Sequence, residues 1–217
     1  MIINRSFSSS FAKEKRFGSL KSLVLLVVIA ILATSNSYAQ ASFETIDGLR
    51  YLLDSDAKTA TLTANTGEKY SGDIVVPEKV KASDGVEYPV TALGDNAFNG
   101  CSGLKSITIP SSVTSLGDDC FQSCSGLTSL TIPSSVTSLG EFCFSYCHSL
   151  TSITIPSSVT SLGKYCFAWC SGLTSVTIPS SVTSLGVCCF YGCSGLTSIT
   201  IPSSVTSLSS GSFSNCI

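Results

Sequence analysis

The stretch Leu127–Ser149 reads LTSLTIPSSVTSLGEFCFSYCHS, and a near copy, LTSITIPSSVTSLGKYCFAWCSG, follows directly at Leu150–Gly172. The same 23-residue unit recurs on both sides of this pair. Its copies begin at Leu104, Leu127, Leu150, Leu173 and Leu196. A fixed period of this length is typical of a solenoid, in which each unit packs against its two neighbours along one axis.

Each unit opens with the pattern of a short strand. Leu127, Leu130 and Ile132 are apolar and are separated by Thr and Ser, which predicts a strand with its apolar side turned inward. Pro133 follows, and proline cannot donate a ladder hydrogen bond. Because a proline returns at this place in every copy, we expect a corner at the same point of every coil.

The second half of the unit is expected to turn the chain back. Gly140 is a natural site for a backbone turn with positive φ. Residues 141–147 then form a turn or a short helix, which would place Cys143, Phe144 and Cys147 on one side.

The pattern L-x-x-I-x-I-P, followed by V-x-x-L-G-x-x-(A/C)-F-x-x-C, resembles the BspA-like branch of leucine-rich repeats, found in many exported bacterial and some protist surface proteins. The resemblance covers Ile74–Cys216, and its divergent first repeat carries ten extra residues around Lys81–Pro89. It implies a right-handed repeat solenoid, each coil being a short parallel strand plus a turn or short helix. It also implies a non-catalytic binding module, with adhesion to a protein or glycan at the cell surface.

Residues 1–39 have the composition of a signal peptide. Basic residues precede an apolar run, Leu23–Ala33, and then the small-x-small site Ser37–Ala39. As a helix this run would span only about 16 Å, short of the ~30 Å of a bilayer core. We therefore expect a secreted or cell-surface protein without stable membrane insertion, an uncleaved anchor being the alternative.

The remaining chain divides into two parts. Residues 40–89 contain strand-like runs at 49–53, 59–64 and 74–76, and we interpret them as an N-terminal β cap and the divergent first repeat. Residues 90–217 are the leucine-rich repeats.

The charge of the chain excludes several classes of partner. Charged residues are only 12% of the sequence, and after residue 39 seven Lys and Arg stand against thirteen Asp and Glu, a net charge of −6. No basic patch is present for nucleic acid or for an anionic membrane.

The sequence contains few side chains suited to catalysis. One histidine, His148, and scattered carboxylates cannot supply a nucleophile with its base. Asp118 and Asp119 are adjacent, but the next copies hold Glu141-Phe142 and Lys164-Tyr165, so we expect no carboxylate cluster. No enzyme activity and no cofactor are predicted.

Ten of the eleven cysteines repeat in two columns, which indicates packing positions because Cys is small and readily buried. Stacked neighbours would lie about 5 Å apart, so disulfides are an alternative. Zinc is disfavoured because the thiols would point into a packed core. Cys188 lies outside both columns and is the thiol expected to be most accessible. The columns are Cys101, Cys124, Cys147, Cys170, Cys193 and Cys216, and Cys120, Cys143, Cys166 and Cys189.

Aromatic residues gather at positions where the copies differ, which suggests contact with a protein or a glycan. The alternative is that these rings fill the space between coils. The candidate binding patch consists of Phe142, Tyr146, Tyr165, Trp169 and Tyr191.

A second surface feature is a hydroxyl ladder at the strands, expected at about 4.8 Å spacing. Such a ladder resembles the face of ice-binding solenoids and could also present hydroxyls to a polysaccharide; an inert solvated sheet is the other interpretation. The ladder consists of Thr108, Thr131, Thr154, Thr177 and Thr200, each with a Ser two residues before it.

Overall fold

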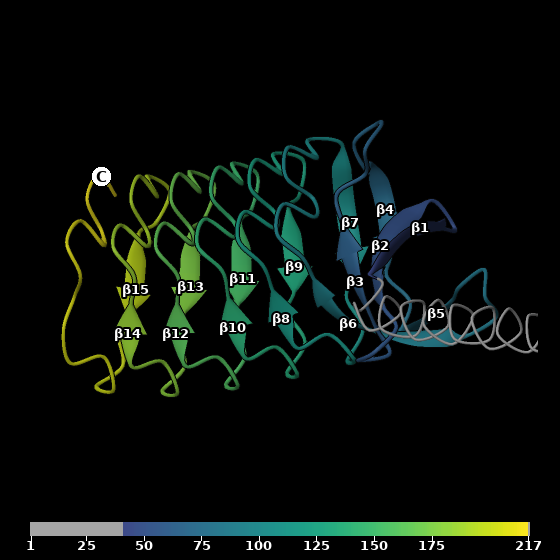
Figure 1. Ribbon diagram of the computed structural model, residues 1–217. Coiled ribbons are helices and arrows are strands. Elements are labelled where there is room, and N and C mark those ends of the chain that lie inside the picture. Colours follow the sequence, from purple (N-terminus) through teal and green to yellow (C-terminus); the bar gives the residue numbers. More distant parts are fainter. Residues whose placement is uncertain (1–40, 217) are drawn as a thin grey trace, which may run out of the picture. The chain divides into compact units, whose positions relative to one another are not determined.

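The computed structural model describes residues 41–216, so the candidate signal peptide at residues 1–39 lies outside the described residues. Residues 41–216 form fifteen strands connected by turns, without a helix. Most of these strands belong to successive coils of a solenoid (Figure 1).

Three antiparallel strands open the described chain: β1 (Ser42–Ile46), β2 (Leu49–Asp54) and β3 (Thr59–Thr63). Alternate residues of β2 and β3 are buried, and Tyr51 is fully enclosed. β3 then pairs in parallel with β6 (Glu87–Leu93). The N-terminal strands thus share one continuous sheet with the repeats, which covers the core at this end of the solenoid.

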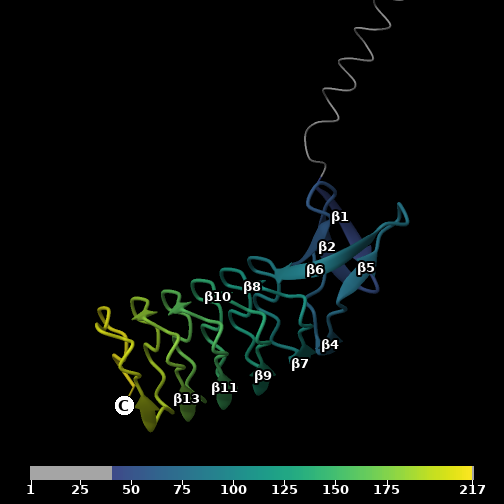
Figure 2. The ribbon, with the colours of Figure 1, turned by 90° about the horizontal axis from the view of Figure 1, so that it is seen from below.

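The inserted residues form a hairpin. β5 (Lys79–Lys81) pairs antiparallel with the start of β6, and the hairpin projects from the coils (Figure 2). β4 (Gly72–Val75) instead pairs in parallel with β7 (Leu104–Thr108), the first strand of the regular copies. The strand-like runs at 49–53, 59–64 and 74–76 coincide with β2, β3 and β4, whereas β1 is an additional strand.

Each regular coil except the last contributes two short parallel strands, which lie on different sides of the coils (Figure 2). One sheet holds β9 (Ser129–Thr131), β11 (Ser152–Thr154), β13 (Ser175–Thr177) and β15 (Ser198–Thr200). The other continues from β6 through β8 (Ser115–Leu116), β10 (Ser138–Leu139), β12 (Ser161–Leu162) and β14 (Ser184–Leu185). The predicted stack of coils with short parallel strands is confirmed. The second strand of each coil was not predicted.

The core is a set of columns in which each residue packs on its equivalent 23 residues away. The rings of Phe121 and Phe144, for example, are stacked with centroids 5.3 Å apart and an angle of 2° between their planes. Both rings are fully buried. Because stacking repeats from coil to coil, one apolar residue per column extends the core by one coil.

The segment 141–147 forms turns rather than a short helix. Phe142 and Tyr146 have positive φ values, 54° and 60°, and the left-handed backbone breaks a right-handed helix at both places. Their N–H groups donate to the next coil, to the carbonyls of Lys164 and Ala168, each over 2.8 Å. The corner therefore combines turn hydrogen bonds within the coil, such as Ser145 to Phe142, with bonds to the next coil, and no helix forms.

Gly140 is required for a different reason from the one expected. Gly140 is not among the residues with positive φ, so the prediction of a left-handed turn there is wrong. A Cβ atom at Gly140 would instead lie 2.5 Å from the carbonyl carbon of Gly117 in the preceding coil. Glycine is needed here because adjacent backbones approach too closely for a side chain.

Candidate functional site

The structure stacks the five aromatic residues of the candidate patch in two groups on the corner of three coils. Phe142 and Tyr165 stack with ring centroids 4.8 Å apart and planes at 3°. Tyr146 and Trp169 stack at 6.1 Å and 16°. Tyr191 meets Trp169 edge-on at 5.0 Å and 75°, which completes the group.

These rings fill the space between neighbouring coils and are also accessible from outside. Phe142, Tyr165 and Tyr191 are half-buried. Tyr146 is 41% exposed and Trp169 37% exposed, and both are among the most exposed large apolar side chains of the described residues. Packing between coils therefore does not remove the patch from the surface.

Four of the five aromatic residues have a left-handed backbone. The φ values are 54° at Phe142, 60° at Tyr146, 53° at Tyr165 and 62° at Trp169. A bulky residue in this region costs about 1–2 kcal/mol relative to one with an ordinary backbone. The other coils fill the same two columns mainly with small or polar residues that tolerate this conformation: Asn96, Asp119, Cys188 and Gly211, and Gly100, Ser123, Gly192 and Asn215.

Polar groups surround the rings. The Tyr191 hydroxyl accepts a hydrogen bond from Nδ2 of Asn215 over 2.7 Å. Nδ1 of the exposed His148 lies 3.2 Å from Oγ of Ser171, and the His148 ring meets that of Tyr146 edge-on at 6.0 Å. The patch combines apolar faces with uncharged donors and acceptors, which can bind a ligand but do not provide a catalytic pair.

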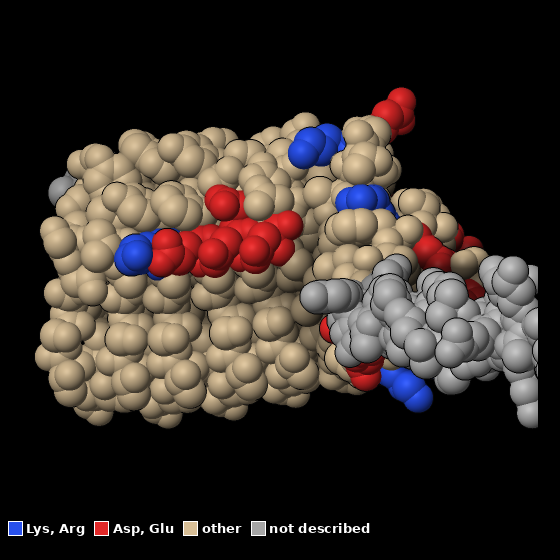
Figure 3. All heavy atoms as spheres, viewed as in Figure 1, with Lys and Arg blue, Asp and Glu red and all other residues tan. Residues whose placement is uncertain are grey.

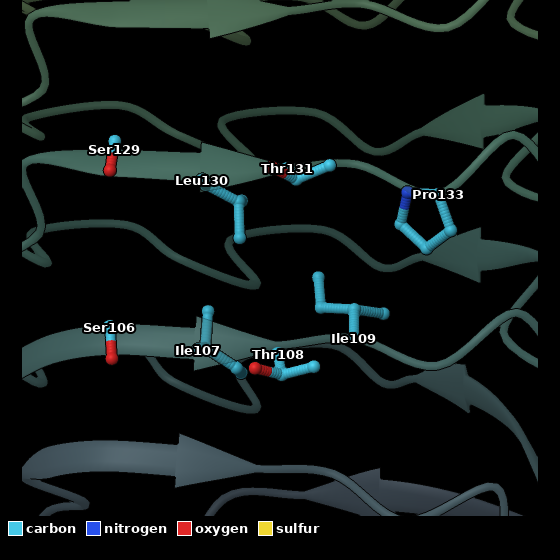
Figure 4. A pocket seen from close by; sticks show the side chains of 8 residues that line it. All are labelled: Ser106, Ile107, Thr108, Ile109, Ser129, Leu130, Thr131 and Pro133. Atoms are coloured by element: carbon cyan, nitrogen blue, oxygen red, sulfur yellow. The ribbon is translucent and has the colours of Figure 1, made fainter.

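The hydroxyl ladder is regular over four of its five members. Thr131, Thr154, Thr177 and Thr200 pair directly in the parallel sheet and are exposed. Thr108 belongs to β7, which has no bridge to β9. A hollow of about 350 Å³ lies between these two strands, lined by side chains of both (Figure 4).

The ladder differs from the other threonine columns. Oγ1 of Thr151 donates to the carbonyl of Thr128 over 3.3 Å, and Oγ1 of Thr137 donates to that of Thr114 over 3.4 Å. Within residues 41–216, the ladder hydroxyls make no such bond to the protein. They face solvent, as do the hydroxyls of Thr128, Thr160 and Thr206 in the other two columns.

The repeat geometry agrees with one protein family. The model of the BspA type leucine-rich-repeat region matches residues 91–217 in six copies. The chain belongs to this family. Such repeats are generally non-catalytic binding modules. None of the curated proteins matches the BspA-type chain.

Solved structures similar to the BspA-type chain are bacterial leucine-rich-repeat proteins. The Treponema pallidum protein TpLRR is 29% identical with a TM-score of 0.70, over 77% of this chain and 75% of its own. A Bacteroides ovatus protein is 30% identical, with a TM-score of 0.70, over 80% of this chain and 45% of its own. A Faecalibacterium prausnitzii protein, described as a leucine-rich cell surface protein, is 27% identical with a TM-score of 0.52, over 73% of this chain and 54% of its own.

The cysteines of the BspA-type repeats lie in the core. Nine of the eleven are buried, Cys188 and Cys216 are half-buried, and all eleven are free thiols. Sγ of Cys147 donates to the carbonyl of Phe121 over 3.1 Å, and the same bond recurs along its column. Burial raises the pKa of the Cys147 thiol to about 12. The buried thiols thus remain protonated and join one coil to the preceding one.

Cys188 belongs to the surface of the aromatic patch. Its thiol lies beside the Tyr165 hydroxyl, and their hydrogen bond raises the pKa of Tyr165. Cys188 and Cys216 are both half-buried, so a second thiol besides Cys188 reaches the surface.

The expectation that the repeats build no carboxylate cluster is wrong. Oδ1 of Asp95 accepts from the N–H of Asp118 over 2.9 Å, and Oδ1 of Asp118 accepts from the N–H of Glu141 over 2.7 Å. Burial, then the charges of these neighbours, raise the pKa of Asp119. Figure 3 shows the resulting acidic row, which ends at Lys164, 2.9 Å from Glu141.

The acidic row is not a metal site. Among residues 41–216, no group of three or more His, Cys, Asp or Glu side chains could hold a metal ion. The same part of the chain contains no helix long and apolar enough to cross a bilayer.

Proposed function

We propose that this chain is an exported, non-catalytic binding module that attaches to an extracellular protein or glycan at a cell surface. Membership of the BspA-type family supports the binding role. The cell-surface description of the Faecalibacterium prausnitzii relative and the signal-like composition of residues 1–39 support export.

The aromatic patch is the contact surface in this proposal. The observation that carries it is the exposure of Tyr146 and Trp169 on a left-handed backbone. A residue that only had to complete the coil would be small or polar there, as Gly192 and Asn215 are. Every coil has the left-handed backbone at these two columns, so the repeat requires the conformation but not a bulky ring in it. Rings kept at this cost support a function beyond packing.

The test replaces each exposed ring with a residue that the backbone accepts. Trp169→Asn and Tyr146→Asn remove the rings and insert the residue that the same column holds at Asn215. Binding would be measured on a glycan array and on immobilised extracellular matrix proteins, with thermal unfolding in parallel. We expect binding to weaken by at least about 10-fold, as for a hot spot, with an unchanged or higher midpoint of unfolding.

Ser123→Asn is the matched control, because Ser123 occupies the same column two coils before Trp169 and carries no ring. It should leave both binding and unfolding unchanged. Intact binding in Trp169→Asn and Tyr146→Asn would remove the patch from the proposal.

The hydroxyl ladder supports a second candidate function, a structural solenoid that binds ice or a polysaccharide. Its specific support is the regular row from Thr131 to Thr200, which has no hydroxyl bonded to the protein, whereas most members of the other threonine columns are bonded to the preceding coil. Thr154→Lys would place a charge in the middle of this row. Ice shaping or polysaccharide binding that disappears in Thr154→Lys and survives in Trp169→Asn would favour the ladder; the opposite result would exclude it.

A further inference from the structure

The coils that carry the aromatic patch have almost no charge. From Cys120 to Cys216 the chain contains two charged side chains, Glu141 and Lys164, which pair with each other over 2.9 Å. Soluble protein surfaces commonly carry about 25–35% charged residues. On the face of these coils that Figure 3 shows, the only charged side chains are those of the acidic row and the lysine at its end. The patch therefore lies in a surface of hydroxyls and rings, with Asp119 and Glu141 of the acidic row at its edge.

This neutrality restricts the ligand. A sulfated or uronate-containing polymer is recognised through Lys and Arg, and Lys164, the one cation of this region, is already engaged by Glu141. Protein partners are steered by complementary charge and often held by Arg anchors, which this surface also lacks. The lack of a free cation and the acidic row at the edge of the patch thus both disfavour an anionic ligand.

The rings leave one aromatic face available. Trp169 covers one side of Tyr146, while the next residue of the column on the other side is Ser123, too small to cover a ring. Tyr146 is 41% exposed as a result. The face of an aromatic ring is electron-rich and attracts the weakly positive C–H groups of a flat apolar surface.

The groups around this face match a polyhydroxylated ligand. The His148–Ser171 pair lies beside Tyr146, and the ring of Tyr191, whose hydroxyl is bonded to Asn215, meets Trp169 edge-on. Each of these groups can donate or accept a hydrogen bond, and none needs a charged partner. Sugar rings present C–H groups on one face and hydroxyls at their edges, so they satisfy both requirements.

We infer that the aromatic patch binds a neutral glycan, with a sugar ring stacked on Tyr146 and Trp169 and its hydroxyls bonded to the polar groups beside them. This inference rests on the proposed function, of which it specifies the ligand class. The ligand class follows from the lack of a free cation in these coils together with the exposed ring face and the uncharged polar groups beside it.

The experiment measures the binding of residues 40–217 to neutral and acidic glycans. The neutral probes are an α-glucan, a β-glucan, a mannan and a galactan, and the acidic probes are a sialylated, a uronate and a sulfated glycan. NaCl is varied from about 0.05 to about 0.5 M, over which the screening length shortens about threefold. We expect binding to at least one neutral probe, independent of salt and at least 10-fold weaker in Trp169→Asn but not in Ser123→Asn.

Two outcomes would overturn the inference while the proposed function stands. One is binding confined to acidic glycans, with a steep decrease at high salt. The other is binding confined to an enzymatically deglycosylated protein. In either case, loss of binding in Trp169→Asn would still identify the patch as the contact surface. If Trp169→Asn leaves every ligand bound, both the patch and the glycan inference are wrong.

Discussion

The indole of Trp169 lies against the backbone of Gly192, so closely that a Cβ atom at Gly192 would be 2.5 Å from Cε3 of the ring. Gly192 occupies the same column as Trp169, one coil further along, and has a φ of 69°. The position of this exposed ring of the patch therefore depends on a residue without a side chain.

Gly192→Ala is expected to displace the indole. The substitution adds both the clash and the left-handed backbone penalty, and should destabilise the fold by about 1–3 kcal/mol. Trp169 is the single tryptophan of the chain, so its fluorescence emission reports the ring directly. We expect a shift of the emission maximum to longer wavelength in native conditions.

Gly72→Ala is the control for this prediction. Gly72 has a φ of 77°, and a Cβ atom added there would have no neighbouring atom within 4 Å. Its replacement therefore carries the backbone penalty without the clash. It should lower stability and leave the emission maximum in place. An unshifted emission in Gly192→Ala would mean that the indole does not depend on Gly192.

Trp169→Gly should be more stable than Trp169→Ala. Both variants lose the indole, and they differ only in whether the backbone at φ 62° carries a Cβ atom. Glycine populates this region without strain, so the glycine variant is expected to have an unfolding free energy higher by about 1 kcal/mol. Chemical denaturation measures the difference. An unfolding free energy of Trp169→Ala equal to or higher than that of Trp169→Gly would contradict a left-handed backbone at Trp169.

Gly140→Ala should destabilise the protein, because the added methyl group meets the backbone of Gly117 at 2.5 Å. The two coils cannot separate locally, since the Gly140 N–H donates to the carbonyl of Leu116 over 3.0 Å. We expect a loss of about 1–3 kcal/mol, the range of an overpacked core. Ser138→Ala, exposed in the same coil, should change the unfolding free energy by less than about 0.5 kcal/mol.

The buried thiols predict a loss of stability at alkaline pH. The ordinary pKa of a Cys thiol is 9.0, and burial raises that of Cys147 to about 12. The thiol contributes its full stabilisation below pH 9, and this is lost as the pH rises toward 12, because the unfolded chain releases the proton first. Each such thiol lowers the unfolding free energy by up to about 1.4 kcal/mol per pH unit in this window.

The same thiols can be counted by titration with a thiol reagent. Cys188 and Cys216 should react in the native state, and the nine buried cysteines only after denaturation. The alkaline decrease in stability should be shallower in Cys147→Ala than in the unmodified chain. Cysteines that react with the reagent in denaturant only after a reductant is added would indicate disulfides.

The features that repeat in the sequence were largely predictable, because a column of identical residues has one environment. Leu130 and Pro133 indicated a strand and its corner, and the cysteine columns indicated packing positions. β10 (Ser138–Leu139) escaped prediction because a strand of two residues has no visible alternation. Its hydrogen bonds come from the neighbouring coils, which a single unit does not contain.

The features that depend on contacts between coils were not predictable in the same way. The role of Gly140 lies in the distance to Gly117, and the acidic row forms because Asp95, Asp118 and Glu141 are equivalent positions of successive coils. The left-handed backbone at Trp169 had one visible signal, the Gly100 and Asn215 of the same column. Both residue types favour positive φ, and the aromatic residues between them concealed the pattern.

The corner hydrogen bonds give the repeats a mechanical direction. The N–H of Phe142 donates to Lys164 and that of Phe144 to Cys166, each over 2.8 Å, so these bonds connect one coil to the next. Tension along the stacking direction acts on one interface between coils after another, so the coils would detach one at a time. Tension along the strands shears all bonds of an interface together and meets more resistance. The direction from which an attached surface pulls therefore decides how much load the module bears before a coil opens.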